Sequence, residues 1–232
     1  MPRPNGPVSK CLQTNLKKGD VVFDIGANCG ATALEISGII GRKGQVFAFE
    51  PNPKMFEQCK VIEEKNLFKN IKFFDHGIGS DDAQKPFFID ISDSSQASTF
   101  DILLLGEEKK LRGSHTFLET KAQIKKLDDL DLPSPNLLKL DIEGSELEAL
   151  LGAKRLLARD RPTVIFEFFF NDRDQRFGKR KKELIDFFDN LDYRVEIISK
   201  WGSDSADLET NNSLAFHEFA EYTGCDLLAT PK

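Results

Sequence analysis

The alternation of short apolar strands with helical segments constrains the fold of this chain more than any other feature. The segments VVFDI (21–25), QVFAFE (45–50) and IKFFD (71–75) are predicted strands, and the segments 31–40 and 54–66 between them have the apolar spacing of helices. A β-α-β-α-β order of this kind predicts a parallel sheet with right-handed crossover connections.

The second half of the chain returns to this alternation after a weakly patterned stretch, residues 76–120, of the kind that often forms a lid or binding loop. Further strands are predicted at 87–90, 121–127, 136–141, 163–170, 193–199 and 225–230, and helices at 145–160 and 179–191. Because no repeat and no linker is evident, we expect a single domain over 1–232, with 1–18 as a flexible or helical lead-in.

Composition excludes several classes of protein. The formal charge of −6 and the pI of about 5.3 argue against a nucleic-acid binder, which usually presents a basic face. No run of eighteen apolar residues exists and the first ten residues lack an apolar segment, so we expect a cytoplasmic protein that does not contact a membrane. The four cysteines are scattered without zinc-site spacing and are expected to be reduced thiols.

The stretch VVFDIGANCG (21–30) runs a strand directly into Asp24 and a glycine turn. Ligands of doubly wound sheets bind beyond the carboxyl ends of the strands, where Gly26 and Gly30 would allow close approach of the backbone. Glu50 ends the next strand, at a position where a carboxylate typically accepts both ribose hydroxyls of a nucleoside. On this account Glu50→Gln would weaken binding less than Glu50→Ala, because one accepting oxygen remains.

The glycine turn also indicates which nucleoside binds. A dinucleotide fingerprint reads G-x-G-x-x-G, whereas DIGANCG carries Asn28 at the second glycine and lacks the third in register. A ligand without phosphates and with an amino-acid tail, S-adenosylmethionine, fits this turn better. A nucleotide-binding oxidoreductase remains an alternative, as does a turn in which the glycines serve only packing.

Four blocks together resemble the FkbM family of S-adenosylmethionine-dependent methyltransferases: VVFDIGANCGATAL, VFAFEPNPKMFE, LLKLDIEGSELEALLGAKRLL and PTVIFEF. The resemblance implies a class I methyltransferase fold, an α/β doubly wound, mostly parallel seven-stranded sheet with helices on both faces and its last strand antiparallel. It also implies O-methylation of a hydroxyl on a sugar, glycan or small natural product, with S-adenosylmethionine as cofactor and S-adenosylhomocysteine as product.

The resemblance further implies which residues contact the cofactor. The methionine end would meet the turn after the first strand, the ribose the end of the second strand, and the adenine the segment after the third. The residues near the methionine end are Asp24, Gly26, Asn28 and Gly30. Those near the ribose are Glu50, Pro51 and Asn52, and those near the adenine are Gly77 and Ile78. The last pair lies in DHGIGSDD, which departs from the family's pattern.

A second acidic cluster, Asp141 and Glu143, follows the predicted strand at 136–141. Methyl transfer to a hydroxyl requires a group that positions the acceptor and removes its proton, so either acid is a candidate base, and Glu167 could join them. His115 is the histidine to test in the same role. Glu143 could instead cap the following helix and Asp141 could accept backbone amides. A divalent metal is left open, because no third ligand is evident.

Two further alternatives concern function. A nucleic-acid methyltransferase is disfavoured, because DIEG stands where amino-methylating enzymes carry an acid-Pro-Pro-aromatic block, and no Pro-Cys nucleophile is present. The second alternative is a non-catalytic protein that retains the methyltransferase fold. The acceptor, expected to be a small molecule or carbohydrate, would be bound by loops at 92–120 and 200–222, which do not identify it. Oligomeric state is not predicted.

Overall fold

A computed structural model describes residues 6–92, 98–99, 116–169, 175–200 and 224–232. Its main sheet has seven strands in the order β10-β11-β9-β8-β1-β2-β3. The strands are β1 (Val21–Ile25), β2 (Gln45–Phe49), β3 (Ile71–Phe74), β8 (Leu137–Leu140), β9 (Thr163–Phe169), β10 (Tyr193–Lys200) and β11 (Gly224–Pro231). Strand β11 runs antiparallel to both neighbours, and the other pairs are parallel, which confirms the predicted sheet.

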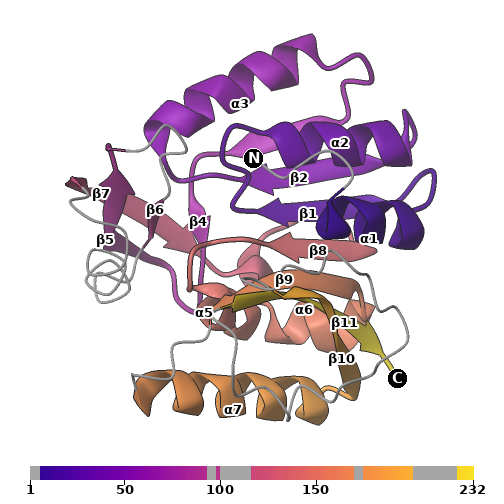
Figure 1. Ribbon diagram of the computed structural model, residues 1–232. Helices are drawn as coiled ribbons and strands as arrows, with labels where there is room; N and C mark the ends of the chain where they lie inside the picture. Colours follow the sequence, from indigo (N-terminus) through magenta and orange to yellow (C-terminus); the bar gives the residue numbers. More distant parts are fainter. Residues whose placement is uncertain (1–5, 93–97, 100–115, 170–174, 201–223) are drawn as a thin grey trace.

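Helices cover both faces of this sheet (Figure 1). They are α1 (Pro7–Asn15), α2 (Ala31–Ile40), α3 (Pro53–Lys65), α5 (Glu146–Leu151), α6 (Lys154–Asp160) and α7 (Gln175–Asn190). Side chains alternate across β1, so Val22 packs in a core with α1, α2 and α3 while Phe23 packs in a core with α5, α6 and α7. Burial on both faces explains why the central strands are continuous apolar runs.

The stretch that we expected to be irregular contains a second sheet beside the first (Figure 1). Its strands, in the order β4-β7-β5-β6, are β4 (Gly77–Ile78), β7 (Phe117–Lys125), β5 (Ala83–Asp90) and β6 (Ser98–Thr99). The predicted strand at 87–90 is therefore only the buried half of β5. The first half of β5 alternates between exposed and partly buried positions and contains Pro86, a residue that usually argues against a strand.

The single helix predicted at 145–160 is wrong, because the structure divides it into α5 and α6 at Gly152. A Cβ atom on Gly152 would lie 1.9 Å from the carbonyl oxygen of Gly79, which follows β4. The backbone at Gly152 therefore packs directly on the second sheet, and this contact places the break between the two helices.

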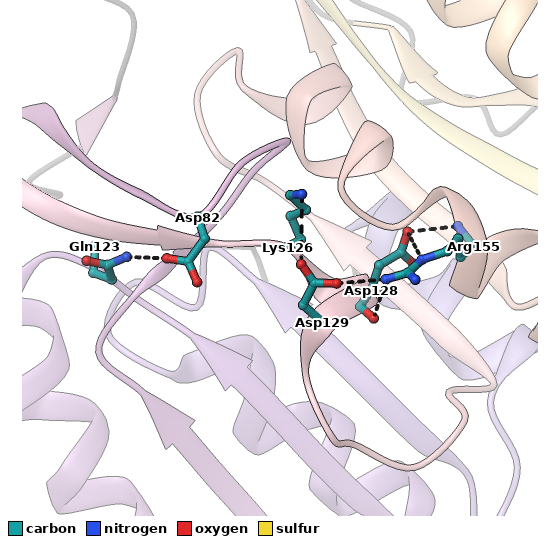
Figure 2. Close-up of polar contacts among 6 residues, drawn as sticks. All are labelled: Asp82, Gln123, Lys126, Asp128, Asp129 and Arg155. Carbon is teal, nitrogen blue, oxygen red and sulfur yellow. Dashed lines mark hydrogen bonds and ion pairs between the residues drawn. The ribbon is translucent and has the colours of Figure 1, made fainter.

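The start of α6 is fixed by Asp128, which lies in the short 3-10 helix η1 (Leu127–Asp129). Its carboxylate accepts backbone N–H bonds from Arg155 at 2.9 Å and from Leu156 at 2.8 Å. Figure 2 shows the Arg155 side chain reaching back over Asp128 and Asp129. Because the Arg155 side chain is 73% exposed, the backbone cap contributes more to stability than these ion pairs do.

We expect Gly152→Ala to lower the free energy of unfolding by about 3 kcal/mol, because the added methyl group meets a backbone carbonyl that cannot move aside cheaply. Gly38→Ala in α2 is the matched control, since a Cβ atom there meets nothing within 4 Å. That variant should be more stable by up to about 1 kcal/mol, the difference in helix propensity. Urea unfolding measures both, and equal effects would refute the packing role of Gly152.

Candidate functional site

The candidate site lies where the strand order reverses, between β1 and β8. Strand β1 pairs in parallel with β2 on one side and with β8 on the other, so the turns that follow these strands meet at one edge of the sheet. Asp24, Glu50 and Asp141, which the sequence places at or near strand ends, are therefore brought to the same edge.

The two glycines of the turn after β1 have packing roles that hold with or without a ligand. Gly26 has a φ of +84°, and a Cβ atom on it would lie 1.9 Å from the carbonyl oxygen of Asp141. Gly30 has a φ of +81°, and a Cβ atom there would lie 3.0 Å from both Ile62 and Phe73. Glycine is needed at both positions for conformation and space. Close approach of a ligand to this turn remains a prediction.

Glu50 connects the turn after β1 to the start of α3. The residue is 4% exposed, and its carboxylate accepts the backbone N–H of Asn28 and that of Asn52, each at 2.7 Å. Asn52 in turn caps α3 by accepting the N–H of Lys54. Burial raises the pKa of Glu50 to about 7 against the opposing effect of the two amides. Each oxygen keeps a second lone pair, so the predicted bonds to ribose hydroxyls are compatible with this geometry.

The other residues expected near the ribose and adenine lie close by in the chain. Pro51 is half-buried between Glu50 and Asn52. Gly77 and Ile78 form β4 and pair with β7, and the Ile78 side chain is part of the main core. Contact between Ile78 and an adenine ring would therefore use its backbone.

A buried lysine, Lys139, joins the two acidic regions and was not predicted. Its Nζ atom lies 3.4 Å from Oδ1 of Asp24 and 3.2 Å from Oδ2 of Asp141. Asp24 is fully buried, and within the described part of the chain neither of its oxygens accepts a well-aligned hydrogen bond. The signal in the sequence was a lysine inside the apolar strand LLKL, since lysine is almost never buried without a partner.

Asp141 is the accessible member of this cluster, with 45% of its side chain exposed. Desolvation acts to raise its pKa, but the Lys139 ammonium and a hydrogen bond from Glu167 hold the pKa below its ordinary value. Burial and the negative charge of Asp141 raise the pKa of Glu167 far above its ordinary value. Glu167 is therefore protonated and donates to an ionised Asp141.

The turn after Asp141 is held by Glu146, a residue that we did not predict. Glu143 and Gly144 have φ values of +52° and +93°, so the chain reverses sharply here. Glu146 is 2% exposed and accepts the N–H of Ile142 at 3.0 Å and of Gly144 at 3.3 Å. Burial raises the pKa of Glu146 to about 7. The catalytic candidate His115 lies outside the described residues.

These carboxyl groups predict an unusual dependence of stability on pH. Glu50 and Glu146 have pKa values of about 7 in the folded protein against an ordinary 4.5, so the folded state binds more protons across this interval. The free energy of unfolding should therefore fall as the pH rises from about 5 to about 7.5. His76, whose pKa is lowered by burial, opposes this trend below its ordinary 6.5, but the raised pKa values of Asp24 and Glu167 act in the same direction as those of Glu50 and Glu146. Urea unfolding at several pH values measures the trend, and stability that rises over this range would contradict it.

Metal and membrane features can be stated only for the part of the chain that the structure describes. There, no group of three or more histidine, cysteine, aspartate or glutamate side chains is arranged to hold a metal ion. Likewise, none of the helices among the described residues is long and apolar enough to cross a bilayer.

Comparison with solved structures defines the fold class. FkbM from Methylobacillus flagellatus superposes with a TM-score of 0.54 at 17% identity, over 92% of this chain and 44% of that one. An S-adenosylmethionine-dependent O-methyltransferase from Thermotoga maritima gives a TM-score of 0.52 at 14% identity, over 97% of this chain and 64% of that one. The fold is that of the class I methyltransferases.

The sequence model of the Methyltransferase FkbM domain matches residues 24–195. The chain therefore belongs to the FkbM methyltransferase family. It is 28% identical over 153 residues to the hexuronic acid methyltransferase AglP of Haloferax volcanii, covering 65% of this chain and 56% of that protein. It is 25% identical over 164 residues to the 2-O-methyltransferase NoeI of Sinorhizobium fredii, covering 66% of each. The chain thus spans little more than half the length of AglP.

Proposed function

We propose that this protein transfers a methyl group from S-adenosylmethionine to a hydroxyl group of a sugar or a related small molecule. Membership of the FkbM family supports the reaction type and disfavours the oxidoreductase alternative. The name of AglP, a hexuronic acid methyltransferase, supports a carbohydrate acceptor, and that of NoeI, a 2-O-methyltransferase, supports methylation on oxygen. The observation that carries the proposal is the meeting of the buried acids Asp24 and Glu50 with the exposed acid Asp141 at one sheet edge.

The buried acids fit the chemistry of S-adenosylmethionine. Asp24 is fully buried 3.4 Å from the Lys139 ammonium, but neither of its oxygens accepts a well-aligned hydrogen bond from the described residues, and the amino group of the cofactor would provide one. Glu50 can accept hydroxyl hydrogen bonds on the lone pairs that the amides of Asn28 and Asn52 leave available. The cofactor supplies an electrophilic methyl group on a positively charged sulfur.

Asp141 is the residue that we assign to the acceptor. Its carboxylate is ionised and accessible, so it can accept the proton of a hydroxyl group as that oxygen forms its bond to the methyl carbon. The hydrogen bond from Glu167 fixes the orientation of the carboxylate and leaves its remaining lone pairs for the acceptor. Proton removal by a positioned carboxylate contributes about 10²–10⁴-fold to a rate.

The test is a methyl-transfer assay with S-adenosylmethionine carrying a ¹³C-labelled methyl group. Neutral hexoses, hexuronic acids and their glycosides are offered as separate acceptors, and products are followed by NMR. The proposal predicts a new O-methyl resonance with at least one carbohydrate class and an equal amount of S-adenosylhomocysteine. If the protein binds S-adenosylmethionine but forms no S-adenosylhomocysteine with any of these acceptors, a non-catalytic protein that retains the fold becomes the better account.

A further inference from the structure

We infer that Lys139 is a positioning residue that joins the cofactor side of the site to its acceptor side, because one ammonium group contacts both Asp24 and Asp141 and so fixes the position of the Asp141 carboxylate. This inference rests on the proposed function, in which Asp141 takes the acceptor's proton. Lys139 itself is 5% exposed and so acts through these two acids.

The geometry connects three segments of the chain through one side chain. From β8, Nζ of Lys139 lies 3.4 Å from Asp24 on β1 and 3.2 Å from Asp141 beyond β8. It also donates to the carbonyl oxygen of Gly26 at 3.5 Å, a long bond to the turn predicted to hold the cofactor. Gly26 in turn packs against the Asp141 backbone. A displacement of the Lys139 side chain would therefore change contacts on both the cofactor side and the acceptor side of the site.

The electrostatic surroundings of Asp141 are otherwise mostly acidic. The charged and titratable groups near it come from β1, β8, the turn after β8, α5, β9, β11 and α7. They are Asp24, Lys139, Glu143, Glu146, Glu167 and Arg180, with Asp226 opposite Glu167 in the sheet. Arg180 is directed to the Gly144 carbonyl and to Glu148, so Lys139 is the cation in contact with Asp141 in the described structure.

Removing Lys139 should change the pKa of Asp141, because Lys139 is the cation that contacts this carboxylate in the described structure. Without the lysine, the Asp141 carboxylate would lose its adjacent ammonium group and remain close to the Glu146 carboxyl group, so its pKa should rise by about 1–3 units. The carboxylate would also lose the ammonium contact that holds it in place. A purely structural role for Lys139, as the counter-ion of buried Asp24, makes a different prediction: neutralising Asp24 and Lys139 together would leave the pKa of Asp141 unchanged.

Two variants separate these roles. Asp24→Asn removes the buried charge and keeps the lysine, whereas Lys139→Met combined with Asp24→Asn removes both charges and leaves no uncompensated buried ion. The Asp141 carboxyl carbon is titrated by ¹³C NMR in each variant, without cofactor or acceptor, and is assigned by its loss in Asp141→Asn. Near-UV circular dichroism establishes that each variant is folded.

The inference predicts that the titration midpoint of Asp141 is about 1–3 pH units higher in the double variant than in Asp24→Asn. A difference below about half a unit would overturn it and leave Lys139 as a counter-ion of Asp24. If the double variant does not fold, the test is an NMR titration of the wild-type protein. The ¹⁵N resonance of the Lys139 ammonium should then shift as Asp141 titrates, and the absence of a shift would overturn the inference. Because neither measurement needs an acceptor, its failure is separate from a failure to observe methyl transfer.

Discussion

Asp141→Asn is expected to lower the rate of methyl transfer by about 10²–10⁴-fold while changing the affinity for S-adenosylmethionine little. The amide oxygen of asparagine can still accept from Lys139 or Glu167, so the loop should keep its conformation. The amide cannot accept the acceptor's proton at neutral pH, and the rate is lost for that reason. Rates at saturating acceptor, calorimetric affinities and thermal midpoints are compared with those of the wild type.

The opposite result would assign Asp141 to structure. In that case the thermal midpoint falls by several degrees, roughly the effect of losing 1–2 kcal/mol, and the rate per folded molecule stays within a few-fold of the wild type. Glu143→Gln, measured in parallel, tests the second acid, and a comparable loss there alone would move the role to Glu143. Activity lost with EDTA and restored by magnesium would add a metal to the site.

Glu50→Ala is expected to weaken S-adenosylmethionine binding by about 2–4 kcal/mol, the value of hydrogen bonds to a charged group. The structure changes the expectation for glutamine at this position. Both carboxylate oxygens accept backbone N–H groups, from Asn28 and from Asn52, so the amide NH₂ of Glu50→Gln would face one of these donors. Glu50→Gln should therefore bind the cofactor no better than Glu50→Ala does.

Calorimetric titration with S-adenosylmethionine measures both variants, with Glu57→Gln on the exposed surface of α3 as the control for charge alone. Wild-type affinity in Glu50→Ala would show that this carboxylate only connects the turn after β1 to α3. Affinity in Glu50→Gln close to that of the wild type, with a large loss in Glu50→Ala, would show that the backbone amides rearrange when the ligand binds.

The doubly wound half of the fold could be predicted because its local patterns and its tertiary environment agree. Strand β1 and helix α2 have the predicted bounds, since the strand is buried on both faces and the helix follows a glycine turn. The division at Gly152 could not be predicted, because its cause is a contact with Gly79, distant in sequence. The second sheet was missed because β5 contains a proline and is buried over only half its length.

The candidate site likewise contains residues that the sequence predicted and residues that it did not. Asp24, Glu50 and Asp141 were predicted at one edge because acids at the ends of adjacent parallel strands must lie near one another. Lys139 and Glu146 were not, because their roles depend on which groups surround them in three dimensions. Sequence position marks the edge of a sheet, whereas the pairing of buried charges is decided by the packing of β1, β8 and the turn beyond β8.

The most direct test of the central claim, that the buried acids at this edge form a site for S-adenosylmethionine, is a calorimetric titration of the folded wild-type protein. We expect a dissociation constant in the micromolar range, corresponding to about −8 kcal/mol, and no measurable binding of NADH under the same conditions. Absence of heat with S-adenosylmethionine at high micromolar concentration, or tighter binding of NADH, would contradict the assignment.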